Sequence, residues 1–210
     1  MLKNIISGQS FEGKMSTREF NLRFRKAENL FGKFLEAIGY DYKNDPNMKE
    51  TPHRYTKVMM KEICKNTYEK PPKITVFDNQ TNYDGIVFEG NIDVKSICSH
   101  HLAFIKGKAY IAYIPKDKVI GLSKLNRIVD YFARRPQLQE QLTMQIHHYL
   151  KEILQCEDVA VLIRADHSCV SMRGVENMDS YTTTCKLSGR FWTNEIGTRN
   201  EFYKMIDAHE

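Results

Sequence analysis

The order in which helical and strand-like hydrophobic patterns follow one another is the strongest constraint on the fold of this chain. Apolar side chains first recur at helical spacing, and after Pro72 they give way to short β-like segments. Helical spacing returns at Ser123, and a second group of β-like segments begins at Val159. Helices and strands that follow one another in separate blocks indicate an α+β protein.

The N-terminal part of the chain predicts two helices. Ser16 begins the sequence Ser-Thr-Arg-Glu, which is a capping box, and apolar side chains then recur at helical spacing as far as Gly39. A second helix should begin with Thr51 as its N-cap and Pro52 in its first turn, and continue through Ile63. A polar connector separates the two. We therefore expect a helical extension at the N-terminus.

The remaining segments complete the predicted order of elements. Short β-like segments are predicted at residues 74–77, 85–90 and 92–115. Helices are predicted to follow from Ser123 and after Pro136. Residues 159–175 and 181–192 are predicted as a further pair of strands, and residues 198–209 as a short terminal helix.

Composition narrows the class of protein. With 210 residues, 41% of them hydrophobic, the chain is of a length and composition typical of one globular domain. No apolar run is long enough for a signal peptide or a membrane span, and five irregularly spaced cysteines argue against a disulfide framework. The net charge of +5 is modest and no basic run appears, so a small anionic substrate fits better than nucleic acid. We expect a cytoplasmic protein with no membrane or nucleic-acid partner.

The segment Cys98-Ser99-His100-His101 is the first candidate for chemistry. It places a thiol and an imidazole three residues apart, and zinc binds both in sites that keep an open position for water. A third ligand must come from elsewhere, and His167-Ser168-Cys169 offers a second thiol and imidazole. The alternative is a buried free cysteine beside ordinary histidines, and spacing alone does not decide between them.

A second candidate is the segment from Gly121 to Arg127, which would hold phosphate. Ser123 at a helix N-cap, with Lys124 and Arg127 on one face of the first turns, would combine free N–H groups with positive charge. The alternative is an ordinary capped helix with solvated basic side chains. It is not a Walker motif. Three further basic residues could add to such a cradle, namely Arg54, Lys57 and Arg173.

Glu140 is a candidate for base recognition. A carboxylate can accept two parallel hydrogen bonds from a guanine N1–H and exocyclic amine, although a glutamate in a helix is most often solvated. The other histidines and cysteines are expected to be surface or packing residues. They are His53, His147, His148, His209, Cys64, Cys156 and Cys185.

These segments together resemble GTP cyclohydrolase I, particularly the bacterial type. The resemblance runs from about Thr51 to Phe202 and is carried by the blocks TPHR, CSHHL, AYIPKDKVIGLSKLNRIV, FARRPQLQEQLTMQI, HSCVSMRGV and TTT, in the family's order. It implies the tunnelling fold, an antiparallel sheet backed by helices. It also implies a homodecamer of two pentamers with active sites at subunit interfaces. The boundaries expected are residues 1–50 for the helical extension and 51–210 for the catalytic domain.

The resemblance assigns roles residue by residue. It implies that Cys98, His101 and Cys169 hold zinc, and that His100 and His167 transfer protons. It implies that Glu140, with neighbouring Gln139, recognises the guanine base. The residues implied around the triphosphate are Arg54, Lys57, Ser123, Lys124, Arg127 and Arg173.

The reaction implied is zinc-dependent hydrolysis and ring rearrangement of GTP. A zinc-activated water attacks C8 of the purine, the ring opens, and a second hydrolysis releases formate and leads to 7,8-dihydroneopterin triphosphate. That product would enter pterin and tetrahydrofolate or 7-deazaguanine synthesis. The alternatives are a nitrile reductase of the same fold acting on a deazaguanine, and a catalytically inactive scaffold.

One position departs from the family's pattern. The family usually has Cys-Glu-His-His, whereas Ser99 stands at the second position here. A serine can hydrogen-bond but supplies no charge, so we expect the departure to affect the tuning of the site rather than its metal ligands.

Overall fold

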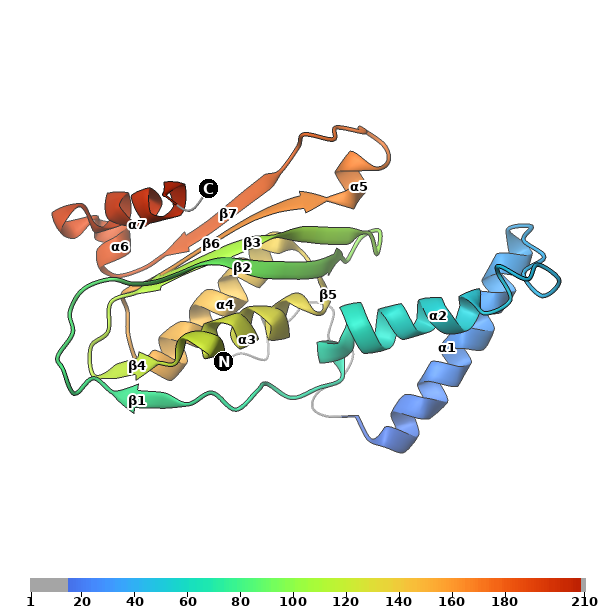
Figure 1. The fold of residues 1–210 in the computed structure, drawn as a ribbon, viewed down its shortest axis with the longest axis horizontal. Helices are drawn as coiled ribbons and strands as arrows, with labels where there is room; N and C mark the ends of the chain where they lie inside the picture. The colour runs from blue at the N-terminus through green and yellow to red at the C-terminus, as the bar shows by residue number, and fades with distance from the viewer. Residues whose placement is uncertain (1–14, 209–210) are drawn as a thin grey trace. The chain divides into compact units, whose positions relative to one another are not determined.

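A computed structural model describes residues 15–208, which form two compact units (Figure 1). One unit ends at Lys70 and the other begins at Pro71 and contains the sheets. The second predicted helix therefore belongs with the first, and the boundary of a catalytic domain at residue 51 stays a prediction. None of the helices in residues 15–208 is long and apolar enough to cross a membrane. His209 lies outside the described residues.

The helical unit begins with α1, Thr17–Ala37, as predicted. The Ser16 hydroxyl accepts a hydrogen bond from the backbone N–H of Glu19 at 3.2 Å, which satisfies one of the free donors of the first turn. Phe24 and Leu35 are buried on one face of the helix.

The second helix runs to Ile63 as predicted, but it differs from the prediction at its start and in the π-helical form of its last part. The helix α2 spans Thr51–Lys57, and its N-cap is Glu50, whose carbonyl accepts from the N–H of Arg54 at 2.9 Å. The prediction that Thr51 is the cap was therefore wrong by one residue. The helix then loosens into a π-helical turn, η2, over Val58–Ile63, and a short 3-10 turn, η3, over Lys65–Thr67.

Two sheets make up the framework of the second unit. The larger has the strand order β5-β2-β3-β6-β7, in which every pair is antiparallel except the pair β2 and β5. The smaller pairs β1 with β4. The bounds are Val76–Asp78 for β1, Val87–Cys98 for β2, Phe104–Tyr113 for β3, Lys118–Ile120 for β4, Pro136–Gln137 for β5, Val159–His167 for β6 and Thr182–Leu187 for β7.

Helices cover both faces of the larger sheet. Because side chains alternate along a strand, Ile111 of β3 packs on the face of α3, Leu122–Ala133, and α4, Gln139–Leu154. Its neighbour Tyr110 packs on the other face. That face is covered by α6, Arg190–Thr193, and α7, Thr198–Asp207, which a short turn, η4, Glu195–Gly197, connects (Figure 1). The predicted α+β class, with an antiparallel sheet backed by helices, is confirmed.

Three local predictions were wrong. The strand expected over residues 159–175 ends at His167, because its partners β3 and β7 extend no further, and the chain closes into a short helix, α5, Ser168–Ser171. The strand expected over residues 181–192 ends at Leu187, and a left-handed Gly189 then starts α6. Ser123 is not an N-cap, since α3 begins at Leu122 with Gly121 as its cap.

Candidate metal centre and nucleotide site

A tight turn between β2 and β3 carries the first pair of candidate ligands. The N–H of Cys98 donates to the carbonyl of Ala103 at 2.8 Å, and the N–H of Leu102 donates back to the carbonyl of Cys98 at 2.9 Å. Leu102 has a positive φ of 51°, which the reversal requires. The turn buries Cys98 and leaves His100 and His101 exposed.

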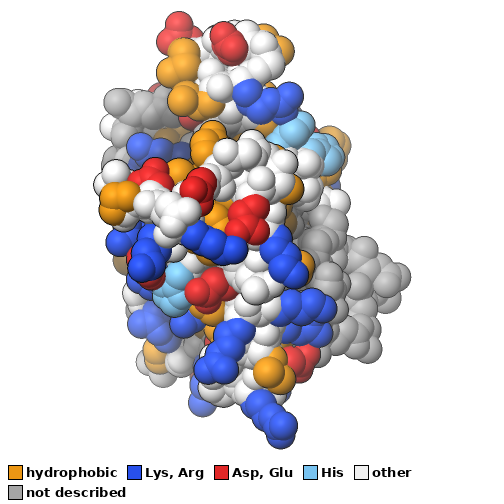
Figure 2. Space-filling view, turned by 90° about the vertical axis from the view of Figure 1, so that its right-hand side faces the viewer, with side chains coloured by type: hydrophobic (Ala, Val, Ile, Leu, Met, Phe, Trp, Pro, Cys, Tyr) orange, Lys and Arg blue, Asp and Glu red, His pale blue; other side chains and the backbone are white. Residues whose placement is uncertain are grey.

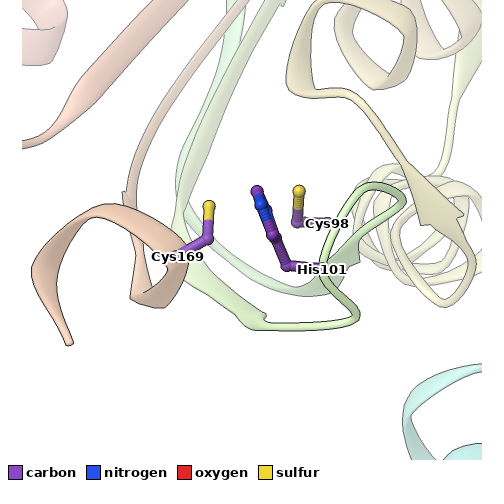
Figure 3. A group of neighbouring side chains, drawn as sticks. All are labelled: Cys98, His101 and Cys169. Atoms are coloured by element: carbon purple, nitrogen blue, oxygen red, sulfur yellow. The ribbon is translucent and has the colours of Figure 1, made fainter. Parts of the chain in front are cut away.

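The third candidate ligand, Cys169, follows directly after β6. This strand runs antiparallel to β3 with His167 opposite Ile105, so the end of β6 lies beside the turn that holds Cys98. The helix α5 starts at once and presents Cys169. The ligand atoms of Cys98, His101 and Cys169 all lie within 4.8 Å of one another, and in Figure 3 the imidazole of His101 lies between the two sulfur atoms.

This donor set fits zinc. Two thiols and one imidazole are the ligand types of tetrahedral zinc sites, and three protein ligands leave one position open. Burial, with the adjacent Cys98 thiol, raises the pKa of the Cys169 thiol. When two thiols lie this close, the ionisation of one disfavours the ionisation of the other. A thiol that coordinates a metal is deprotonated, so a bound cation would stabilise both thiolates.

The two histidines predicted for proton transfer lie in different surroundings. His100 is exposed in the β2–β3 turn, next to His101. His167 is half-buried at the end of β6, where its Nε2 lies 2.7 Å from the side-chain oxygen of Gln139. Burial lowers the pKa of His167, and the charges of Asp166 and Glu140 oppose that shift.

The N-terminal turn of α4 brings Gln139 and Glu140 to the same place with opposite exposure. Glu140 is exposed, and its charge acts on His167. Gln139 is only 3% exposed, and its amide nitrogen has three acceptors at 3.0 Å. They are the carbonyls of Ile163 and Thr182 and the hydroxyl of Thr184. Every polar atom of the Gln139 side chain therefore contacts another part of the protein.

The residues predicted for the triphosphate fall into separate groups. Ser123 and Arg127 are exposed and Lys124 half-buried in the first turns of α3. Arg173 is exposed just after α5, where its charge reaches the Cys169 thiol. Arg54 and Lys57 are exposed on α2, which belongs to the helical unit.

The charges visible on one face of the molecule are mixed in sign. In Figure 2, lysine and arginine side chains are interspersed with acidic ones. Lys57, for example, forms an ion pair with Glu62 at 3.4 Å. This agrees with the modest net charge of +5.

Sequence reasoning missed two residues beside the site. The hydroxyls of Thr143 and Thr184 lie 2.7 Å apart and next to Gln139. A usable signal existed for Thr143, which stands one helical turn after Gln139. None existed for Thr184, because its position depends on the register between β6 and β7.

The matching family model and two sequence relatives concern GTP cyclohydrolase I. The family model for GTP cyclohydrolase I matches residues 27–207, which extends further toward the N-terminus than the resemblance from Thr51 suggested. GTP cyclohydrolase 1 of Aeromonas salmonicida is 46% identical over 178 residues, covering 84% of this chain and 81% of the relative. GTP cyclohydrolase 1 of Flavobacterium johnsoniae is 45% identical over 173 residues, covering 82% and 76%.

A solved structure gives only a partial likeness. The crystal structure of the archaeosine synthase QueF-Like in the apo form has a TM-score of 0.42 and 17% identity, covering 50% of this chain and 93% of that one. The description of the fold therefore rests on the elements given above.

Proposed function

Because this chain belongs to the GTP cyclohydrolase I family, we propose that Cys98, His101 and Cys169 hold a zinc ion at the centre of its active site. The activity itself is that of a GTP cyclohydrolase, the first step of pterin and folate synthesis, and the resemblance found in the sequence is confirmed. The family match favours this hydrolase over the nitrile reductase considered as an alternative. Retention of the ligand set speaks against an inactive scaffold.

One observation carries the proposal for zinc. Cys98 and His101 at the β2–β3 turn and Cys169 in α5, about 70 residues later in the chain, place their ligand atoms within 4.8 Å of one another. Zinc bound there would lower the pKa of a coordinated water toward neutrality and so supply hydroxide for attack on C8 of the purine.

The two histidines would move protons. His167, whose imidazole is fixed at Nε2, is our candidate for the proton at N7 of the purine. His100, exposed in the turn, is our candidate for acid and base work near the ribose ring oxygen, whose opening precedes closure of the pterin ring. An imidazole suits both roles because one ring nitrogen can donate a proton while the other accepts one.

Glu140 would select guanine. Its carboxylate is exposed in the first turn of α4, and it acts electrostatically on His167. A carboxylate accepts from both the N1–H and the exocyclic amine of guanine, whereas adenine offers a different donor pattern. Gln139, predicted to share this role, has its amide directed to His167 and the sheet, and we propose that it acts by holding His167.

Basic residues would surround the triphosphate. Ser123, Lys124 and Arg127 lie where the free N–H groups and dipole of the helix α3 favour an anion. We propose that Arg173, Arg54 and Lys57 also bind the triphosphate.

We also propose a homodecamer of two pentamers with shared active sites, working in the cytoplasm. Two features support association. β7 is an edge of the larger sheet and leaves backbone groups free to pair, and α1 exposes Leu30, Phe34 and Ile38, each by more than half. The five cysteines are all free thiols, which agrees with a reducing compartment.

Exchange of one ligand tests the metal site. Cys169→Ser should lose both bound zinc and turnover of GTP, because a serine hydroxyl is a poor zinc ligand. The matched control is Cys185→Ser, in which the changed thiol lies beside Tyr203 and away from the site, and which should keep both. Metal analysis of protein purified without chelator, together with formate release, measures the two effects. A Cys169→Ser enzyme of full activity would remove this residue from the site.

A further inference from the structure

A closed ring of hydrogen bonds lies behind His167. The amide nitrogen of Gln139 lies 3.0 Å from the hydroxyl of Thr184, and that hydroxyl lies 2.7 Å from the hydroxyl of Thr143. The Thr143 hydroxyl lies 3.0 Å from the backbone carbonyl of Gln139, which completes the ring. The ring therefore ties α4 to the edge strand β7 at the point where Gln139 reaches His167.

Backbone carbonyls fix the direction of every hydrogen bond in this ring, because they can only accept. Thr143 must donate its single proton to the carbonyl of Gln139, so the contact between the two threonines is donated by Thr184. Thr184 in turn accepts from the amide nitrogen of Gln139. No alternative arrangement of the hydroxyl protons satisfies all three contacts.

The same reasoning orients the amide of Gln139. Its nitrogen faces the carbonyls of Ile163 and Thr182, so exchanging nitrogen and oxygen would set an oxygen against two carbonyl oxygens. The side-chain oxygen is thus held against Nε2 of His167, at 2.7 Å. An amide oxygen accepts only, so Nε2 must carry a proton.

We propose that Thr184, acting through Gln139 and together with Thr143, is a positioning residue that holds His167 with its proton on Nε2 and leaves Nδ1 as the nitrogen that exchanges protons with the substrate. The proposal rests on the proposed role of His167 in catalysis. Within the TTT block of the sequence, it assigns this function to the side chain of Thr184, since side chains alternate along β7 and Thr183 lies on the opposite face.

The burial of the ring explains why one hydroxyl matters. Thr143 is 2% exposed and Gln139 is 3% exposed, so water does not replace a lost partner there. The two N–H groups of the Gln139 amide are shared among three acceptors, and without the Thr184 hydroxyl only the carbonyls of Ile163 and Thr182 remain. The Thr143 hydroxyl loses its donor. The imidazole is then held by an amide that is itself less constrained.

Substitutions of matched shape test the proposal in the zinc-loaded enzyme. Thr184→Val keeps the shape and removes the hydroxyl, and it should lower kcat for GTP about tenfold, the cost of about one hydrogen bond, while KM stays within about twofold. Thr184→Ser restores the hydroxyl and should recover most of kcat. The control is Thr183→Val, which makes the same change on the exposed neighbour and should leave kcat unchanged. Thr143→Val should reproduce the loss if Thr184→Val does not fold.

A double substitution shows whether the effect passes through His167. In the His167→Ala background, Thr184→Val should have no further effect on kcat, because the group that it positions is gone. An equal loss in both backgrounds, a Thr184→Ser enzyme as slow as Thr184→Val, or a rise in KM with unchanged kcat would each overturn the proposal. If His167→Ala alone kept full activity, the proposed role of His167 would fail instead, so the two failures are distinguishable.

The tautomer can be observed directly. Solid-state NMR of holoenzyme labelled with 15N-histidine, with the His167 signal assigned by its absence in His167→Ala, should show Nε2 protonated and Nδ1 unprotonated in neutral His167. A proton on Nδ1 instead would overturn the assignment of the reacting nitrogen.

Discussion

Two imidazoles on or beside α4 are each held by one hydrogen bond but differ in their surroundings. At the start of the helix, Gln139 holds the half-buried His167 at 2.7 Å, and in its middle His147 is held by the Ser188 hydroxyl at 2.9 Å. Burial lowers the pKa of both histidines. What differs is the charge around each ring: acidic groups oppose the shift at His167, whereas positive groups add to it at His147.

The comparison teaches that the surroundings of a fixed imidazole decide whether it can serve in the proton transfer proposed for His167 or only in packing. Nearby carboxylates and partial exposure leave His167 able to exchange a proton. His147 is 1% exposed and its pKa is lowered to about 4, so it stays neutral at physiological pH. This confirms the expectation from sequence that His147 is a packing residue.

The largest effect should come from removing the histidine at the active-site end. His167→Ala should lower kcat by about a thousandfold, within the range that a general acid or base contributes, and leave zinc content and folding unchanged. Formate release and metal analysis of the same preparation measure both. If kcat fell by less than about fivefold, the contrast between the two histidines would disappear.

Glu140→Gln should have the next largest effect. The amide places a donor where guanine also presents donors, so we expect kcat/KM for GTP to fall by about a hundredfold. Steady-state kinetics at saturating zinc measure it, and the exposed Glu152 on the same helix offers a matched control as Glu152→Gln. Unchanged kinetics in Glu140→Gln would take this residue out of the site.

The smallest effect on turnover should come from His147→Gln, which should keep activity at neutral pH within about twofold. Its effect is on acid stability. Below pH 6.5 the unfolded chain binds a proton at His147 that the folded chain excludes until about pH 4, so the native protein loses stability as pH falls through that window. The loss from this site is about 3 kcal/mol when complete, because the pKa of His147 is lowered from its ordinary value of 6.5 to about 4.

Urea unfolding at several pH values and one fixed protein concentration measures this loss. The wild type should show a steeper fall in the free energy of unfolding between pH 6.5 and 4 than His147→Gln does. The charged groups that add to the shift are His148, Lys151 and Lys186. Parallel curves for the two proteins would show that His147 does not govern acid stability.

The fold was predictable where local sequence determines it. Ser16 and the turn that follows it form a cap from contacts within four residues, and the prediction was confirmed. The cap at Ser123 was wrong because β4 ends at Ile120 and pairs with β1, a contact made far along the chain, and the next helix starts at Leu122. Pairing between distant strands is what periodicity alone does not reveal.

The candidate site, too, was predictable only in part from the sequence. Residue types and blocks pointed to Cys98, His101 and Cys169, and the structure brings these three together. The link from Gln139 to His167 was not foreseen, since it depends on how β6 and β7 are registered against the start of α4. Residue roles are visible in a motif, whereas the hydrogen-bond partners that hold each residue in place require the fold.

The most direct test of the account is a zinc titration of the enzyme. The metal is removed with a chelator, zinc is added back in steps, and turnover of GTP is plotted against zinc bound per chain. We expect activity to be lost with the metal and to rise in proportion to bound zinc, reaching its plateau at about one zinc per chain, with no rise in Cys169→Ser. A metal-free enzyme that opens GTP at the full rate would contradict the assignment of Cys98, His101 and Cys169.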